Sequence, residues 1–416
     1  MVIYSSGAVA DVPAEPPYAD DEWDGGRPPP RRSTGSGRKK KRRKPKAPLW
    51  TKLCITFGVL IALVSFGFVG GSKLILAQAT KSVSQQDLLG DQGAKAKGHV
   101  TINGPQNILL LGLDNRPGQN PNDLVRSDSI IILHIAADHQ SAYMVSIPRD
   151  LWVHIPAYPK TKFLGQDDKI NAAFAFGNAK GGGYAGGVEL LAKTINQYWG
   201  ITFNAAAIVD FEGFQQVVNV LGGVDMYVDQ EVTSLQIGHD KNGNFAAPYK
   251  INPDGTIKSK VPGVTPVVYH KGYQHLAPWQ ALDFVRQRDQ LPNTDYDRQR
   301  HQQQFIKALF KEILSKNVLT DPVKLNKVLD VVGKAMTVDT GGISIPDWIF
   351  AMKGITGDAL VTLKTNNGTY HTQKINGQDT EQLDQNTEDL LAAVKNDTVG
   401  AFVVEHPSLV VSSDGP

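Results

Sequence analysis

The sequence predicts an α/β domain, because short apolar runs with the character of buried strands alternate with segments of helical periodicity. Two runs rich in Ile and Leu, "NILLLGLD" and "SDSIIILHIA", are followed by "AYMVSIPRD", and turn residues bound all three. Such continuous runs are typical of strands that are buried on both faces of a sheet. "GGVELLAKTINQYWG" then has apolar residues at helical spacing and a terminal glycine, which predicts a helix.

The alternation continues in the second half of the chain. "AAAIVDF" predicts a strand, "EGFQQVVNVLGG" a helix and "VDMYV" a strand, and two helical segments follow, "GYQHLAPWQALDFVRQR" and "DYDRQRHQQQFIKALFKEILSKN". Residues 236–260 are polar and rich in turn residues, which predicts a hairpin excursion or a loop. We therefore expect one folded domain over residues 99–400, followed by a flexible tail over residues 401–416.

Composition excludes some kinds of site but selects no function. The chain has 416 residues, of which 41% are hydrophobic and 20% charged, as in ordinary globular proteins. Its net charge of +2 hides an asymmetry, since residues 1–52 carry twelve Lys or Arg against six Asp or Glu. The remainder is slightly acidic and predicts no nucleic-acid partner. Cys54 is the only cysteine, which excludes an internal disulfide and a thiolate metal site.

The N-terminal region predicts a disordered tail and a membrane anchor. Residues 1–48 are rich in Pro, Gly, Ser and charge, a composition that cannot offset the entropy of folding. The uncharged run between Lys52 and Lys73 is long enough for a transmembrane helix, which we place within residues 49–76 and follow with a linker over residues 77–98. The basic run "RKKKRRKPK" before it keeps the tail cytoplasmic by the positive-inside rule. We expect a single-pass protein of the cell membrane with its folded domain extracellular.

Two other interpretations of this region are weaker. "LAQA" at residues 76–79 resembles a signal-peptidase site, but an apolar segment this long behind a charged region of about fifty residues favours an uncut anchor. The basic run also resembles a nucleic-acid patch. Its position directly before an apolar segment instead favours a topology signal and contact with anionic membrane lipid.

Charged residues stand at the ends of the predicted strands. "LGLDNR" ends one strand at Asp114, "RSDS" begins the next with Arg126 and Asp128, and "SIPRD" ends the third with Arg149 and Asp150. Open α/β sheets place their sites at strand ends, and charges there are costly unless they are paired or bound to a ligand. Asp114 and Asp128 could share a magnesium ion, which prefers carboxylate oxygens, or a buried Arg/Asp pair could form instead.

A second cluster of charge occupies "RQRDQLPNTDYDRQRHQQQF". On a helix, Asp295, Arg298 and Gln302 share one face. Arg286 and Arg288 lie on the same side once the backbone is extended, as expected before Pro292. Guanidinium groups fork onto two oxygens, so this cluster suits a phosphate or pyrophosphate, although a salt-bridge network has the same composition. Lys169, in "DDKINAAFAFG", adds a point charge for phosphate.

Taken together, the ordered motifs resemble the LytR-CpsA-Psr family of membrane-anchored cell-wall enzymes. The resemblance rests on "NILLLGLDNR", "RSDSIIILHI", "SIPRDLWV", "KINAAFAFG", "VDFEGFQQVVNVLGGVDMYV", "GYQHLAPWQALDFVRQR" and "DYDRQRHQQQFIKAL". It implies a mixed central β-sheet flanked by helices, with an apolar cavity for a lipid. It also implies a magnesium-dependent phosphotransferase that moves a glycopolymer from a polyprenyl pyrophosphate carrier onto peptidoglycan through a phosphodiester bond.

The same resemblance implies roles for individual residues. Asp114 and Asp128 are similar to the family's magnesium ligands, and the proton of the acceptor hydroxyl would pass to a carboxylate, for which Asp114, Asp150 and Asp295 are candidates. We expect Arg149, Asp114 and Asp295 to be catalytic. The residues expected to bind pyrophosphate are Arg126, Arg149, Lys169, Arg286, Arg288, Arg298 and Gln302.

Two further functions use the same residues. In the first, the arginine cluster would hydrolyse a lipid pyrophosphate with water as the acceptor. In the second, the arginines would form only a salt-bridge network, and the chain would be a non-enzymatic, membrane-anchored regulator of the cell envelope.

Overall fold

The computed structural model describes residues 84–93, 102–113, 125–209, 211–252, 256–315, 318, 321–352 and 354–411. The predicted disordered tail and transmembrane helix lie outside the described residues, and so does Asp114. Among the residues that are described, no helix combines the length and the apolar character needed to cross a membrane.

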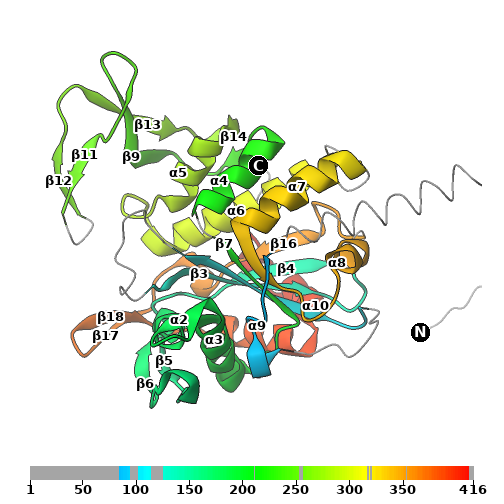
Figure 1. Ribbon diagram of the computed structural model, residues 1–416. Helices are drawn as coiled ribbons and strands as arrows, with labels where there is room; N and C mark the ends of the chain where they lie inside the picture. Colours follow the sequence, from blue (N-terminus) through cyan, green and yellow to red (C-terminus); the bar gives the residue numbers. More distant parts are fainter. Residues whose placement is uncertain are drawn as a thin grey trace, which may run out of the picture. The chain divides into compact units, whose positions relative to one another are not determined.

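A seven-stranded mixed sheet forms the centre of the fold, in the order β1-β15-β7-β2-β3-β4-β16 (Figure 1). β2 runs antiparallel to β3 and parallel to β7, while β4 runs antiparallel to β3 and parallel to β16. This confirms the predicted α/β class with a mixed central sheet. The strands are β1 (Ser84–Gln85), β2 (Gln106–Leu113), β3 (Ser127–Ile135), β4 (Ala142–Ser146), β7 (Ala205–Val209), β15 (Met336–Asp339) and β16 (Leu360–Leu363).

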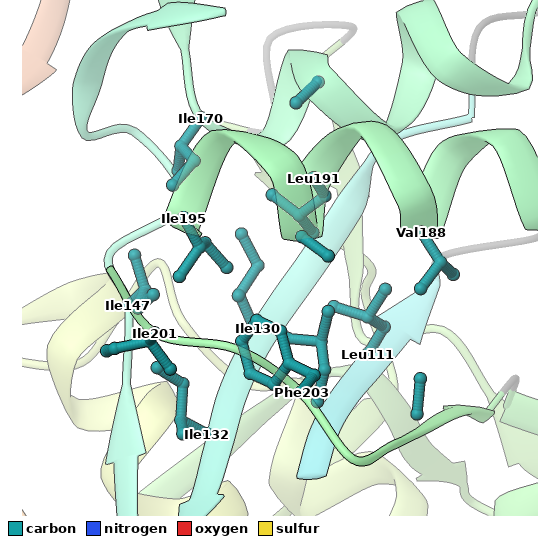
Figure 2. Close-up of a cluster of buried hydrophobic side chains, with 14 of the residues drawn as sticks. Leu111, Ile130, Ile132, Ile147, Ile170, Val188, Leu191, Ile195, Ile201 and Phe203 are labelled. Carbon is teal, nitrogen blue, oxygen red and sulfur yellow. The ribbon is translucent and has the colours of Figure 1, made fainter. Parts of the chain in front are cut away.

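Both faces of this sheet are covered, as the continuous apolar runs predict. On one face α2 (Asn171–Asn178), α3 (Gly183–Trp199) and α9 (Gln385–Asn396) pack over the strands. Figure 2 shows Leu191 and Ile195 of α3 directed at the strand residues Leu111, Ile130 and Ile132. The other face is covered by α6 (Thr294–Ser315) and α8 (Ile345–Met352).

Close packing of α2 on α3 depends on glycine. A Cβ atom at Gly187 would lie 2.8 Å from the ring of Phe174 and 2.9 Å from its carbonyl oxygen. A larger residue would therefore push the two helices apart. This contact holds α2, which begins at Asn171, two residues after Lys169, against α3.

A second group of elements extends from α6 (Figure 1). Its helices are α4 (Phe211–Leu221), α5 (Pro278–Arg286) and α7 (Pro322–Ala335), and β8 (Val224–Val228) pairs antiparallel with β14 (Gly272–Leu276). An antiparallel sheet of β9 (Val232–Asp240), β10 (Phe245–Ala246) and β13 (Val264–Tyr269) follows, with the ribbon β11 (Tyr249–Ile251) and β12 (Ile257–Lys260). The predicted excursion at residues 236–260 is thus a set of hairpins. The remaining strand pairs are β5 (Trp152–Ile155) with β6 (Gln166–Lys169) and β17 (Thr372–Ile375) with β18 (Gln378–Glu381).

Residues 84–93 belong to the folded domain, although we assigned them to a linker. β1 pairs in parallel with β15, and Leu88 and Leu89 are buried in the main core. Their backbone amides both donate to Asp339 Oδ2 at 2.9 Å. The prediction failed because the segment is mostly polar, and its two leucines find their partners far along the chain.

The C-terminal segment is also folded further than we predicted. α10 (Val399–Glu405) follows α9, and Leu409 and Val411 are buried. The backbone amide of Val411 donates to the carbonyl of Thr362 at 2.8 Å. Residues 401–411 are therefore part of the domain and not of a flexible tail.

Candidate functional site

Four arginines from three separate segments line one pocket of about 210 Å³, which we call the arginine pocket. Arg149 follows β4, Arg286 and Arg288 lie at and after the end of α5, and Arg298 is on the first turns of α6. The lining is completed by Gly112, Leu113, Asp128, Ser129, Gln236, Asp289 and Gln302. Four of the arginines in the sequence motifs thus converge.

A second hollow of about 460 Å³ adjoins the arginine pocket and shares Arg149, Arg288 and Asp289 with it. We call it the Asp295 hollow. Its other lining residues are Asp150, Leu235, Thr256, Ile257, Gln290, Thr294, Asp295 and Tyr370. Arginines and carboxylates line both hollows.

Arg149 is surrounded by three carboxylates. Its Nη1 donates to Asp128 Oδ1 at 2.5 Å, and its Nε lies 3.6 Å from Asp150 Oδ2 and 3.5 Å from Asp295 Oδ1. Burial alone would lower the pKa of Arg149, but these carboxylates outweigh burial and raise it above its ordinary value. The guanidinium is therefore permanently charged and held in one orientation.

Asp295 is held by the arginines in turn. Arg298 Nη2 lies 2.6 Å from Asp295 Oδ1 and also donates to the backbone oxygen of Asp128 at 2.8 Å. Gln299 donates to Asp295 Oδ2 at 3.0 Å. Burial would raise the pKa of Asp295, but Arg298 and Arg149 outweigh burial and lower it. Asp295 is thus ionised at neutral pH and acts as a hydrogen-bond acceptor.

Two buried N–H groups beside the pocket lack a hydrogen-bond acceptor within the described part of the chain. These are Nε of Arg149 and Nε of Arg298. Both guanidinium groups are more than four-fifths buried, with side-chain exposures of 17% and 8%. Buried donors of this kind are costly unless a ligand or water accepts from them, so both are suited to an anion's oxygens.

Gln302 of α6 lines the pocket and forms hydrogen bonds to β3 and α5. Its Oε1 accepts from Ser129 Oγ of β3 at 2.8 Å, and its Nε2 donates to the carbonyl of Val285 in α5 at 3.4 Å. Gln302 therefore lines the pocket and also positions α6 against the sheet.

Two of the predicted pyrophosphate ligands do not line either hollow. Lys169 Nζ lies 2.9 Å from Asp150 Oδ1. Lys169 therefore forms an ion pair with a residue that lines the Asp295 hollow, without lining the hollow itself. Arg126 Nη1 donates to Asn171 Oδ1 at 3.4 Å, at the start of α2. The structure places both next to the site and not among its lining residues.

The predicted magnesium site is only half described. Asp128 lines the arginine pocket, but its proposed partner Asp114 falls outside the described residues. Within the described ranges, no group of three or more His, Cys, Asp or Glu side chains could hold a metal ion. The magnesium pair therefore stays a prediction.

A buried polar network behind Arg286 and Arg288 was not predicted. Gln287 lies between these arginines and its side chain is 2% exposed. Its amide donates to Gln236 Oε1 at 2.6 Å and to Asp283 Oδ1 at 2.9 Å, and it accepts from the backbone amide of Leu235 at 3.1 Å. The arginine segment is therefore fastened to β9.

The same network continues into the core. Asp283 also accepts from Ser234 Oγ at 3.0 Å and from the hydroxyl of Tyr269 at 2.8 Å. Burial raises the pKa of Asp283 despite these donors. Alternation could have indicated Gln287, because the middle residue of an extended Arg-Gln-Arg segment points away from both arginines.

Comparison with known proteins agrees with this architecture. A model of the LytR_cpsA_psr family matches residues 73–393. A polyisoprenyl-teichoic acid–peptidoglycan teichoic acid transferase, TagU, of Oceanobacillus iheyensis is 31% identical over 233 residues, which cover 56% of this chain and 58% of that protein. The TagU protein of Bacillus cereus strain AH820 is 33% identical over 236 residues, which cover 56% of this chain and 62% of that protein. The match thus spans about three-fifths of these relatives.

A crystal structure shows the same fold. Protein gbs0355 of Streptococcus agalactiae superimposes with a TM-score of 0.52 at 21% identity, over 71% of this chain and 88% of that one.

Proposed function

This chain belongs to the LytR-CpsA-Psr family, and we propose that it is a membrane-anchored phosphotransferase that moves a glycopolymer from a polyprenyl pyrophosphate carrier onto peptidoglycan. The observation that carries the proposal is the convergence of Arg149, Arg286, Arg288 and Arg298 on one pocket. The relatives' names, which specify polyisoprenyl-linked teichoic acid and peptidoglycan, support this substrate class.

The arginines suit the charge that develops when a pyrophosphate is split. Negative charge grows on the bridging and leaving oxygens, and fixed guanidinium groups stabilise it without a covalent enzyme intermediate. Arg149 and Arg298 are already oriented by Asp128 and Asp295, so little reorganisation accompanies the reaction. Loss of one such donor typically lowers the rate about 10²-fold or more.

The acceptor sugar hydroxyl must lose a proton as it attacks phosphorus. Asp295 and Asp150 both line the Asp295 hollow, next to the arginine pocket, where an acceptor would enter. Two arginines keep Asp295 ionised, so its carboxylate is free of a proton at neutral pH. Its lowered pKa also makes it a weak base. Comparing Asp114→Asn, Asp150→Asn and Asp295→Asn in the transfer assay tests all three candidates for the carboxylate that accepts the proton.

Magnesium remains part of the proposal. Carboxylate oxygens such as those of Asp128 are its preferred ligands, with Asp114 as the expected second carboxylate. When bound, the ion would supply additional positive charge beside the phosphates. Transfer should then fall after chelation and return with added magnesium, and Asp128→Asn should raise the magnesium concentration required.

We also propose the topology that the sequence predicts, with an anchor within residues 49–76, a cytoplasmic N-terminus and an extracellular catalytic domain. Proteolysis of intact spheroplasts tests it. The domain should be digested from outside, whereas a domain that is digested only after lysis would refute the topology.

The central experiment uses the full-length chain in proteoliposomes with a radiolabelled lipid-linked glycopolymer and purified peptidoglycan. Label on the peptidoglycan supports transfer. Release of free phosphorylated polymer regardless of peptidoglycan would favour the hydrolase, and no reaction would favour the regulator.

Arg298→Gln should abolish most transfer in this assay. Arg300→Gln is the matched control, because Arg300 is on the same helix and is also ion-paired, with Asp229 and Asp297, but does not line the arginine pocket.

A further inference from the structure

The hairpins beside the site expose apolar side chains. Among the residues that the structure describes, ten large hydrophobic side chains are exposed, and three lie between positions 245 and 257. These are Phe245, Ile251 and Ile257, with exposures of 64%, 43% and 42%. An exposed apolar group of this kind marks a surface that something else covers.

The two isoleucines form one unit. Ile251 of β11 and Ile257 of β12 are cross-strand partners, and their ribbon pairs with no other strand of the described chain. Figure 1 shows this ribbon at the end of the excursion, away from the helices. Two-stranded ribbons are marginally stable alone, so the exposed isoleucine pair would gain from an apolar surrounding.

Phe245 lies on the neighbouring hairpin and packs against α5. Its ring meets Trp279 edge-on at 5.0 Å, and together they line a shallow hollow of about 310 Å³ with Ile237 and Gln236. Gln236 also lines the arginine pocket. The hollow around Phe245 therefore shares a lining residue with the arginine pocket.

Four lysines lie in the same stretch of the chain as these apolar residues. Lys241, Lys250, Lys258 and Lys260 are all exposed, and the same stretch of residues 236–260 contains only two aspartates. Exposed apolar residues interspersed with lysine are typical of segments that lie in the interface of an anionic membrane. A protein partner fits less well, because lysine is depleted from protein–protein interfaces.

We propose that residues 241–251 and 256–260 dock on an anionic lipid surface, with Phe245, Ile251 and Ile257 inserted among the head groups and the lysines on lipid phosphates. Thr256 and Ile257 also line the Asp295 hollow, so this contact would hold the site at the level of the head groups. The contact is separate from the predicted anchor.

An environment-sensitive fluorophore tests the docking directly. The full-length chain with Cys54→Ser carries the label at Ile251→Cys, and the matched control carries it at Val404→Cys, on an exposed residue of α10. Both are reconstituted in phosphatidylcholine vesicles with and without phosphatidylglycerol. We expect the label at 251 to shift to the blue and to be quenched by nitroxide lipids in the anionic vesicles, while the label at 404 stays polar.

A charge variant completes the test. Each lysine near an anionic surface contributes about a five-fold gain in binding, so Lys250→Glu with Lys258→Glu should lower the equilibrium constant for insertion by more than about twenty-fold. Lys374→Glu, on the exposed hairpin of β17 and β18, should leave it unchanged. The proposal is overturned if the label at 251 behaves like the label at 404. An equal response in neutral vesicles also overturns it, because the lysines would then have no role.

Discussion

Replacing Arg298 by glutamine should weaken both folding and anion binding, and the structure sets the size of the first effect. The Arg298 guanidinium lies 2.6 Å from Asp295 Oδ1 and donates to the carbonyl of Asp128 at 2.8 Å. Breaking a buried ion pair costs about 3–5 kcal/mol when the partner is left alone. Here Arg149 Nε remains 3.5 Å from the same oxygen. We therefore expect a loss of about 1.5–3 kcal/mol at pH 7, as for a hydrogen bond to a charged group.

The loss should depend on pH in a defined direction. The folded-state pKa of Asp295 lies below its ordinary value because Arg298 and Arg149 outweigh burial. Its ionised form therefore stabilises the fold above the unfolded pKa of about 3.9, and this stabilisation disappears as pH falls through the lower folded value. Arg298→Gln removes part of that stabilisation. The difference in free energy of unfolding between wild type and variant should reach its full size at pH 7 and shrink below about pH 4.

Urea unfolding at pH 7 and at pH 3 measures the effect on stability. Calorimetric titration with inorganic pyrophosphate measures binding. Arg300→Gln should lose comparable stability, because Arg300 Nε lies 2.6 Å from Asp229 Oδ2, but should bind pyrophosphate normally. Equal losses of binding in the two variants would refute the arginine pocket as the anion site. A stability difference that does not change between pH 7 and pH 3 would refute the role of Asp295.

Three further predictions test the framework around the site. Gly187→Ala should lower stability by about 1–3 kcal/mol, since its Cβ would lie 2.8 Å from the ring of Phe174; thermal unfolding measures this loss. Gln287→Leu should lower the free energy of unfolding by about 1–3 kcal/mol, because it leaves the buried partners Gln236 and Asp283 unsatisfied. It should also weaken pyrophosphate binding, and an unchanged affinity would show that the network does not position the arginines. Asp339→Ala should speed amide hydrogen exchange at Leu88, and unchanged exchange there would contradict the fastening of residues 84–93.

The sequence could predict the arginine pocket because its members belong to short motifs with strong local constraints. The backbone becomes extended at Gln287, directly after α5, which lets Arg286 and Arg288 line one pocket, and helical spacing puts Arg298 beside Asp295. Convergence with Arg149 required the family resemblance, since no local pattern relates residues separated by more than a hundred positions. The motifs do not show which charged side chains pair with one another. Lys169 was predicted to bind phosphate, and in the structure its Nζ contacts Asp150.

The sequence could not predict residues that reach the site or the core only through a contact with a distant part of the chain. Tyr370 lines the Asp295 hollow from a polar, turn-rich segment without helical or strand periodicity. Its ring meets Tyr296 edge-on at 5.5 Å, and that contact depends on how β17 and β18 pack on α6. Leu88 and Leu89 are a similar case, because their burial follows from β15, far along the chain.

The carboxylates around Arg149 determine how an anion can enter. Asp128 occupies Nη1, so a phosphate oxygen that approaches this nitrogen must displace a carboxylate at 2.5 Å. Among the described residues, neither Nε of Arg149 nor Nε of Arg298 has a hydrogen-bond acceptor. Binding at these two nitrogens breaks no hydrogen bond between described residues, although at Nε of Arg149 an anion competes with the ion pairs to Asp150 and Asp295. Binding at Nη1 is an exchange of one anion for another. Affinity for a simple phosphate should therefore be modest, while the orientation of a bound pyrophosphate is fixed by guanidinium groups that Asp128 and Asp295 already hold in place.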